Sequence, residues 1–274
     1  MESNDAKNKS FFDNLRPGQM FFFGIAEGVL VLCTIGFFIL LGMFLKGDST
    51  LSFGNDQAEY EGGGEVVGGG AVAQAPRLID VAEEAELDLS QFKSCVQQNR
   101  FADKVDADAD EALAAGGRGT PYSIVIGPKG ETIPIKGAYP YKKVEGVVKQ
   151  LLGQSVGYLA ASLPAAKTGI TVRPVDPKKE AVKGNPNAKI TIIEYSDFEC
   201  SFCKLYHDTM NQLLANYGND IRWAYRHFPL DGMHQKARFE ALAAECAAEQ
   251  GKFWEFIDGI FAVTPSNDGM DINL

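Results

Sequence analysis

Two hydrophobic periods alternate along the chain after residue 76. Residues 77–87 place Leu78, Val81, Ala82 and Ala85 on one face, so this stretch predicts an amphipathic helix. The same spacing predicts further helices over residues 90–99, 102–116, 141–153, 200–218, 234–251 and 252–263. Runs of β-branched and aromatic residues predict strands at residues 120–127, 132–137, 189–196 and 221–229. Strands that alternate with helices are typical of a layered α/β fold.

An apolar run occupies residues 20–45, with Glu27 as its only charged residue. About 20 apolar residues can cross a bilayer as a helix, so we expect one N-terminal transmembrane signal-anchor there. A buried helix and a cleaved signal peptide are the alternatives. Three Lys and Arg residues precede the run, and the positive-inside rule then places residues 1–19 in the cytoplasm. The rest of the chain is expected outside the cytoplasm, held by a single pass through the cytoplasmic (inner) membrane, in the periplasm where one exists.

Residues 46–75 are Gly-rich and acidic, and they predict a flexible linker because they cannot bury enough apolar surface to order themselves. Residues 76–274 have the size of one domain. That domain divides into three parts, at residues 76–153, 154–188 and 189–274. The middle part is rich in Ala, Pro and Lys, and we interpret it as a connector. A short helix near Tyr158 and an extended piece at residues 170–175 are expected within it.

Composition narrows the choice of partners. Of the 274 residues 45% are hydrophobic, which permits a sizeable core. The net charge of −10 argues against nucleic acid as a partner, because phosphate binding needs a basic face. An oxidising compartment outside the cytoplasm would allow the cysteines to form lasting disulfides.

Cys200 and Cys203 form a C-x-x-C pair in the stretch FECSFCK, where a predicted strand gives way to a predicted helix. Free N–H groups and the helix dipole stabilise a thiolate at a helix N-terminus and lower its pKa. The pattern therefore predicts a redox pair, with Cys200 as the nucleophile and Cys203, one turn later, as the resolving thiol. A zinc site that adds His207 is one alternative, although a structural site needs a fourth ligand. Two plain core thiols are the other alternative.

Residues 190–230 resemble DsbA-like thiol–disulfide oxidoreductases of the thioredoxin superfamily, and the likeness continues through residues 245–261. The usual C-P-x-C of that family is Cys-Ser-Phe-Cys here, so Ser201 departs from the common proline. The resemblance implies that Ser201 and Phe202 tune the pKa of the thiols. It also implies that Glu194 is a buried acid below the cysteines that assists proton transfer, with a solvent-facing strand residue as the alternative. It implies no metal and no organic cofactor.

The family's second active-site element, a loop with a cis proline, lies upstream of the cysteines in this chain. The stretch GGRGTPYSIVIG resembles that loop and the strand after it. The resemblance implies that Pro121 is cis and faces the cysteines, and that Thr120 offers backbone groups to a substrate peptide. An ordinary trans proline is the alternative.

The segments around this loop, residues 86–121 and 137–152, resemble the family's C-terminal half. Residues 76–153 would then be the cis-proline half and residues 189–274 the C-x-x-C half, in exchanged order. We therefore expect a thioredoxin-like fold with a helical insertion and a circularly permuted order. A truncated tandem of two domains is the alternative.

A second disulfide is implied by the same resemblance, since some proteins of the family carry one in the helical insertion. In the permuted arrangement the helices with Cys95 and Cys246 would be neighbours, so a structural disulfide between these two residues is expected. Buried free thiols are the alternative.

No catalytic role is expected for the histidines and aromatic residues of the C-x-x-C half. Nothing beside the histidines resembles a Cys–His hydrolase, so surface or tuning roles are expected for His207, His227 and His234. Core or rim positions, rather than a cofactor site, are expected for the aromatic residues Tyr195, Phe198, Phe202 and Trp223.

The resemblance implies a membrane-tethered enzyme that forms or exchanges disulfides in exported proteins with thiols. It also implies a membrane partner of the DsbB or VKOR kind that reoxidises the cysteine pair. A tethered chaperone or binding module without turnover is one alternative, and a fragment that folds only with another chain is the other.

Overall fold

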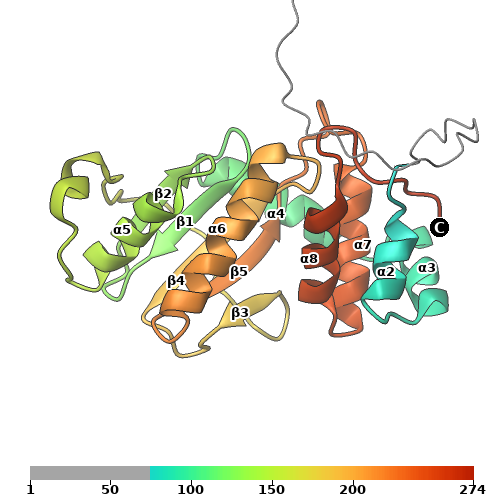
Figure 1. Ribbon diagram of the computed structural model, residues 1–274, viewed down its shortest axis with the longest axis horizontal. Helices are drawn as coiled ribbons and strands as arrows, with labels where there is room; N and C mark the ends of the chain where they lie inside the picture. The colour runs from blue at the N-terminus through green and yellow to red at the C-terminus, as the bar shows by residue number, and fades with distance from the viewer. Residues whose placement is uncertain (1–74) are drawn as a thin grey trace, which may run out of the picture. The chain divides into compact units, whose positions relative to one another are not determined.

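The computed structural model describes residues 75–274 (Figure 1). The expected cytoplasmic segment 1–19, the expected anchor at 20–45 and nearly all of the expected linker lie outside the described residues. Within residues 75–274, no helix is both long enough and apolar enough to span a bilayer.

Seven α-helices and one short 3-10 helix lie among the described residues. The α-helices are α2 (Leu78–Glu84), α3 (Leu89–Gln97), α4 (Ala102–Ala114), α5 (Tyr141–Leu151), α6 (Ser201–Tyr217), α7 (Ala237–Glu249) and α8 (Phe253–Val263), and the 3-10 helix is η2 (Gly157–Ser162). The strands are β1 (Tyr122–Ile126), β2 (Thr132–Lys136), β3 (Val182–Gly184), β4 (Ile190–Ser196) and β5 (Ile221–His227). Each helix and strand that the hydrophobic pattern predicts is present, within a few residues at its ends.

The five strands form one sheet in the order β2-β1-β4-β5-β3. The middle strand β4 runs parallel to β5 and antiparallel to β1, with Tyr195 opposite Tyr122. The pair β1 and β2 comes from residues 76–153, whereas β4 and β5 come from residues 189–274. The two expected halves therefore share one sheet.

The connector contains one strand that the sequence pattern did not predict. Residues 170–175, expected to be extended, lie outside any helix or strand, and Val182–Gly184 form β3, which pairs antiparallel with β5. A strand of three residues is too short to show the alternation of apolar and polar residues on which sequence patterns depend. The short helix expected near Tyr158 is η2.

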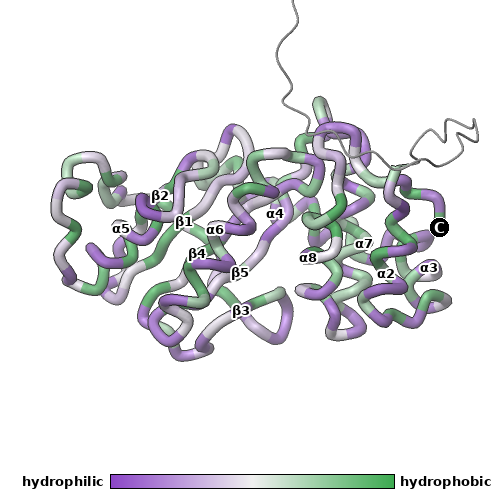
Figure 2. The backbone as a smooth tube through the Cα atoms, viewed as in Figure 1, coloured by the Kyte–Doolittle hydropathy of each residue, from purple (hydrophilic) through white to green (hydrophobic). Residues whose placement is uncertain are grey.

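The core has a separate apolar cluster on each face of the sheet. On one face Ile190 and Ile192 of β4 pack with α6 and α8, and on the other Ile193 packs near Ala112 of α4. Every residue of β4 is buried, as expected for a central strand covered on both faces. Figure 2 shows β4 mostly in hydrophobic colours and β5 mostly in hydrophilic ones, so the polar residues of β5 need partners in the interior.

Arg226 on β5 is the most deeply buried cation of the described residues, with 1% of its surface exposed. Its guanidinium donates to Glu111 Oε2 on α4 at 2.6 Å and to Glu180 Oε2 in the connector at 2.8 Å. It also donates to the carbonyl oxygen of Arg173 at 3.1 Å. A buried charge is tolerated only when its partners compensate for lost hydration. All three parts of the domain therefore supply groups to one buried network.

The helices α2, α3, α7 and α8 pack together beside the sheet, and a disulfide links them. Cys95 of α3 and Cys246 of α7 are bonded, with their Cα atoms 5.8 Å apart. This is the pairing that the family resemblance implies. The segment around Asp271 runs beside the start of α2, where the Leu78 N–H donates to the Asp271 carbonyl oxygen at 2.8 Å.

Replacing both cysteines of this disulfide, Cys95→Ala with Cys246→Ala, is expected to lower the free energy of unfolding by about 2–5 kcal/mol. The bond closes a loop between residues 151 positions apart, so its loss gives the unfolded chain more conformational freedom. Urea unfolding of the oxidised chain, followed by circular dichroism, measures the change. An unchanged unfolding midpoint would contradict the structural role of the bond.

Candidate functional site

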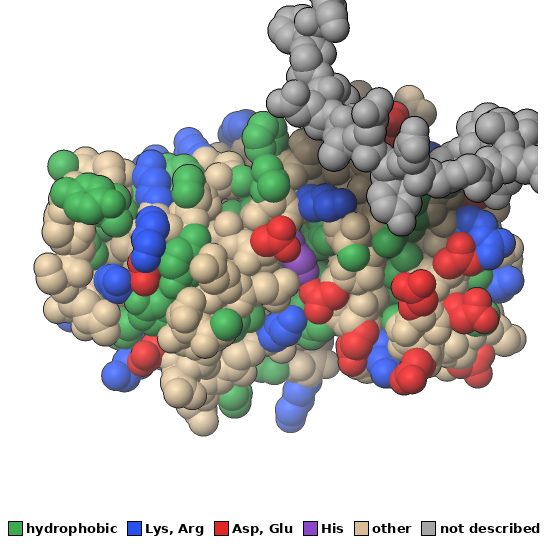
Figure 3. All heavy atoms as spheres, viewed as in Figure 1, with side chains coloured by type: hydrophobic (Ala, Val, Ile, Leu, Met, Phe, Trp, Pro, Cys, Tyr) green, Lys and Arg blue, Asp and Glu red, His purple; other side chains and the backbone are tan. Residues whose placement is uncertain are grey.

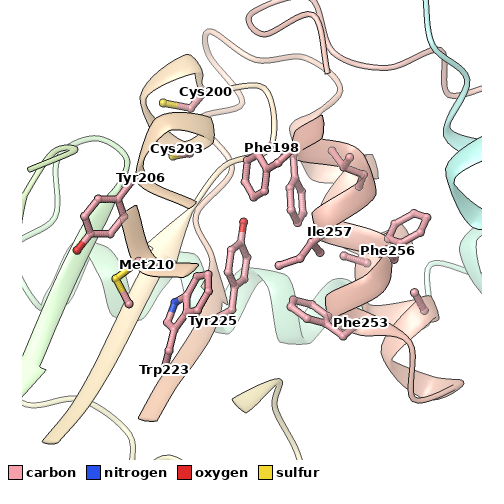
Figure 4. Packing of buried hydrophobic residues seen from close by; sticks show 14 of the residues in the cluster. Phe198, Cys200, Cys203, Tyr206, Met210, Trp223, Tyr225, Phe253, Phe256 and Ile257 are labelled. Carbon is pink, nitrogen blue, oxygen red and sulfur yellow. The ribbon is translucent and has the colours of Figure 1, made fainter. Parts of the chain in front are cut away.

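Both cysteines of the C-x-x-C pair lie at the start of α6. The strand β4 ends at Ser196, and a turn held by the hydrogen bond from Cys200 N–H to the Asp197 carbonyl oxygen, at 3.2 Å, leads into the helix. Cys200 is the N-cap residue of α6, and Cys203 lies in its first turn. Both are free thiols; Cys200 is 6% exposed and Cys203 is fully buried. Figure 4 shows Cys203 below Cys200 at the start of α6. Only the first sulfur is therefore placed to meet another molecule.

The loop before β1 lies across from this pair. The Thr120–Pro121 peptide bond is cis, and β1 begins at the next residue. Because Tyr122 pairs with Tyr195 in the antiparallel ladder, the residues before Tyr122 run beside the turn that follows β4. In its protonated form the Cys200 thiol donates to the Thr120 carbonyl oxygen, with 3.5 Å between sulfur and oxygen. The structure thus brings together the cysteine pair and the loop, which lie 80 positions apart in the sequence.

The surroundings of Cys200 favour its thiolate. A hydrogen bond from the Cys203 thiol is the largest influence, and it outweighs the opposing effect of partial burial. The Thr120 side chain and the N–H groups of Phe202 and Cys203 add to it. Together they lower the pKa of Cys200 to about 6. Cys200 is therefore mostly a thiolate at neutral pH.

The pKa values of Cys203 and Glu194 are raised, in contrast to that of Cys200. Burial, strengthened by the negative charge of Cys200, raises the pKa of Cys203 well above its ordinary value. Burial also raises the pKa of Glu194 to about 8, and the nearby Ser196 and Trp223 side chains offset it only in part. Glu194 is fully buried, so the alternative of a solvent-facing strand residue is wrong.

A cluster of buried polar atoms lies on the face of the sheet that α6 covers. It comprises the Glu194 carboxyl, the Ser196 and Tyr225 hydroxyls and the Trp223 indole N–H, none of which has a hydrogen-bond partner of good geometry among the described residues. The register pairs Glu194 with Tyr225 and Ser196 with His227, so these side chains stand in adjacent rows of β4 and β5. The sequence interpretation missed Ser196 and Tyr225. The alternation of side chains along each strand predicts which residues share a face of that strand. Only the pairing register shows that the polar residues of β4 lie beside those of β5.

The exposed rim of the site is apolar. Phe202 is 60% exposed, Leu205 on the next turn of α6 is 61% exposed, and Met233 in the loop after β5 is 73% exposed. Figure 3 shows hydrophobic side chains over this end of α6. Ser201, the other residue between the cysteines, is half-buried. Of the other aromatic candidates, Tyr195, Phe198 and Trp223 are core residues, in agreement with the core-or-rim prediction.

The surface role expected for the three histidines is wrong. His207, His227 and His234 are all buried, and each has one ring nitrogen against a carboxylate oxygen at 2.6–2.9 Å. The partners are Asp258, Glu245 and Asp197, respectively. Each pair joins residues from different helices, strands or turns, so local sequence contains no sign of it.

Across residues 75–274 there is no cluster of three or more His, Cys, Asp or Glu side chains that could hold a metal ion. The third ligand of the zinc alternative, His207, directs Nε2 to Asp258 Oδ1 at 2.6 Å.

The segment that contains the cysteine pair is similar in sequence to known proteins. Residues 176–267 match the family model described as thioredoxin. The chain is 42% identical over 90 residues to Na(+)/H(+) antiporter NhaA 1 of Mycolicibacterium gilvum, covering 33% of this chain and 15% of the antiporter. It is also 42% identical over 105 residues to Na(+)/H(+) antiporter NhaA 3 of Salinispora tropica, covering 38% of this chain and 16% of that protein.

Among solved structures, a match is found with DsbA2 of Pseudomonas aeruginosa. The two are 33% identical over 36% of this chain and 54% of that one, with a TM-score of 0.32. The chain spans only about 15% of the length of the antiporters named above. The family match covers about a third of the chain and contains both cysteines of the pair, so the chain contains a thioredoxin-like domain with a mixed α/β fold.

Removing the thiol beside Cys200 is expected to weaken its thiolate. In Cys203→Ala the pKa of Cys200 should rise above about 6, because the largest stabilising hydrogen bond is lost. Cys203→Ser, which keeps a donor of similar size, is the matched control and should give a smaller rise. The ultraviolet absorbance of the thiolate, followed against pH, measures both pKa values. Equal rises in the two variants would contradict the hydrogen-bond origin of the low pKa.

The raised pKa of Glu194 predicts a pH dependence of stability. Between pH 4.5 and about 8 the folded chain keeps a proton on Glu194 that the unfolded chain releases, so the free energy of unfolding falls as the pH rises through this range. Glu194→Gln removes that fall and should be more stable than the parent at pH 8.5, on the order of 4 kcal/mol. Urea unfolding at several pH values measures it. Glu84→Gln, at an exposed position of α2, is the control and should follow the parent.

Proposed function

We propose that this chain is a DsbA-like thiol–disulfide oxidoreductase that forms or exchanges disulfides in exported proteins. One observation carries the proposal: the Cys200 sulfur lies at the N-terminus of α6, 3.5 Å from the Thr120 carbonyl oxygen, with the Cys203 thiol behind it. Disulfide exchange needs a nucleophilic sulfur with a favoured thiolate and a second sulfur within reach to resolve the mixed disulfide.

The chemistry follows from the two different thiol environments. In the oxidised enzyme a substrate thiolate attacks the Cys200 sulfur, the bond to Cys203 breaks, and Cys203 leaves and takes a proton because burial disfavours its thiolate. A second substrate thiolate then attacks the substrate sulfur of the mixed disulfide. Cys200 leaves as a thiolate, and its lowered pKa makes it a good leaving group. The substrate gains a disulfide, and the enzyme retains a thiolate and a thiol.

Substrate binding is assigned to the loop and rim around Cys200. A cavity of about 240 Å³ beside the loop is lined by Gly119, Thr120 and Lys136, among others. An extended peptide laid along it would reach the backbone of Thr120 and the exposed apolar side chains of Phe202 and Leu205. Backbone hydrogen bonds and apolar contacts are largely independent of sequence, so this surface suits unfolded chains of varied composition.

We propose further that the domain contains the two halves of a DsbA-like domain in circularly permuted order. Three features support this: β1 of residues 76–153 pairs with β4 of residues 189–274, the Thr120 loop faces Cys200, and a disulfide joins Cys95 to Cys246. If the chain were a truncated tandem of two domains, residues 76–153 would not be expected to complete the site of residues 189–274.

The location and partners are proposals from the sequence. The apolar run at residues 20–45 is proposed to anchor the chain in the cytoplasmic membrane, with residues 46–75 as a tether and the catalytic domain outside the cytoplasm. A membrane protein of the DsbB or VKOR kind is proposed to reoxidise the cysteine pair.

Oxidation of a reduced, unfolded substrate tests the proposal. The full chain should oxidise such a substrate in the presence of glutathione disulfide, and Cys200→Ser should lower the rate to that of glutathione alone, because no enzyme sulfur can then be attacked. Cys203→Ser can no longer release a bound substrate by attack on the Cys200 sulfur, so with a substrate that has one thiol it should accumulate a mixed disulfide, visible on a non-reducing gel. A Cys200→Ser chain that still suppresses substrate aggregation, beside a parent chain with no oxidising activity, would favour a chaperone.

A further inference from the structure

His234 and Asp197 form a buried pair next to the cysteine turn. The Nδ1 atom of His234 lies 2.8 Å from Asp197 Oδ2, and both residues are less than 5% exposed. His234 belongs to the loop between β5 and α7, whereas Asp197 is the first residue after β4. The loop is held at a second point, because the Leu230 N–H donates to the same carboxylate oxygen at 2.8 Å.

The same aspartate also holds the turn that presents Cys200. Its Oδ1 accepts from the Glu199 N–H at 2.9 Å, and its carbonyl oxygen accepts from the Cys200 N–H at 3.2 Å. One residue therefore connects the imidazole of His234 to the backbone of the nucleophilic cysteine. Disulfide exchange as described above uses Cys200 and Cys203 and leaves this pair without a role.

We propose that His234, held by Asp197, is a redox-linked proton site for the cysteine pair. The inference rests on the proposed function, since disulfide exchange supplies the proton. When a substrate with two thiols reduces the Cys200–Cys203 bond, the substrate gives up two electrons and two protons and becomes a disulfide. One proton goes to Cys203, and Cys200 remains a thiolate. The second proton goes to His234, so that a cation forms on the partner of Asp197, the residue that also holds the turn of the new anion.

The charges around His234 support this assignment. Burial alone would lower the pKa of His234, but the hydrogen bond to Asp197 and the charges of Asp197, Cys200 and Glu199 outweigh it and raise the pKa above its ordinary value. The charged groups that act on His234 are Asp197, Glu199 and Cys200 in the turn before α6, and the charges of Glu240 on α7 and Lys236 lie near two of them, Asp197 and Glu199. Of these, Cys200 is the one whose charge disappears on oxidation.

This coupling is reciprocal: if the thiolate favours the imidazolium, loss of the thiolate must release the proton. His207 supplies a second buried histidine signal, and its carboxylate partner is Asp258 on α8, which is 44% exposed, rather than the buried Asp197. A merely structural histidine would show the same pKa in both redox states.

Histidine titration by NMR tests the proposal on the full parent chain, once oxidised and once reduced with dithiothreitol. The pKa of His234 should be about 0.5–1 unit higher in the reduced form than in the oxidised form. The variants His207→Gln and His227→Gln identify two of the three signals and leave His234 by elimination, so the test does not require a folded His234 variant. Asp197→Asn should lower the pKa of His234 in both states.

An unchanged pKa of His234 between the two redox states would overturn the proposal. The titration uses a small dithiol and needs no substrate turnover, so it separates this proposal from the proposed function. A redox-dependent pKa in a chain that cannot oxidise protein substrates would support the proton site and count against the function. An active chain with an unchanged pKa of His234 would do the reverse.

Discussion

The antiparallel pairing of β1 with β4 carries the Thr120 loop to Cys200 across a sequence separation of 80 positions. Its register sets what can meet: with Tyr122 opposite Tyr195, the residues that precede β1 lie beside the turn that follows β4. A shift by one residue would turn Glu194 to the other face of the sheet. The apolar residues on both faces of β4 prevent such a shift, because it would exchange the two apolar clusters.

The extent of burial sets the direction of the pKa shift of each titratable group near the cysteines. Cys200 lies at the surface end of α6, where N–H groups and a neighbouring thiol stabilise its anion. Cys203 and Glu194 lie beneath it, where burial favours the neutral form. The two thiols are separated by one helical turn and yet differ in the direction of their pKa shifts. In the proposed mechanism, that difference makes Cys200 the nucleophile and leaving group and keeps Cys203 protonated.

Much of the secondary structure could be predicted from local patterns, because a helix or strand that covers an apolar core repeats its apolar residues at a fixed spacing. The helix at α6 and the strands β4 and β5 follow such patterns. The strand β3 does not, since its three residues are held by pairing with β5 rather than by a pattern of their own. The buried histidines were missed for a related reason: their carboxylate partners come from distant parts of the chain.

The sequence by itself determined the strand, the C-x-x-C pair and the helix that follows, because strand and helix formation and the placing of Cys200 at a helix start depend on neighbouring residues. Only the tertiary structure decided which carbonyl lies against the Cys200 sulfur, that Glu194 is buried, that Cys95 meets Cys246, and that His234 faces Asp197. These are contacts between distant segments. They depend on sheet register and helix packing, and those are set by the burial of the whole core rather than by any local stretch.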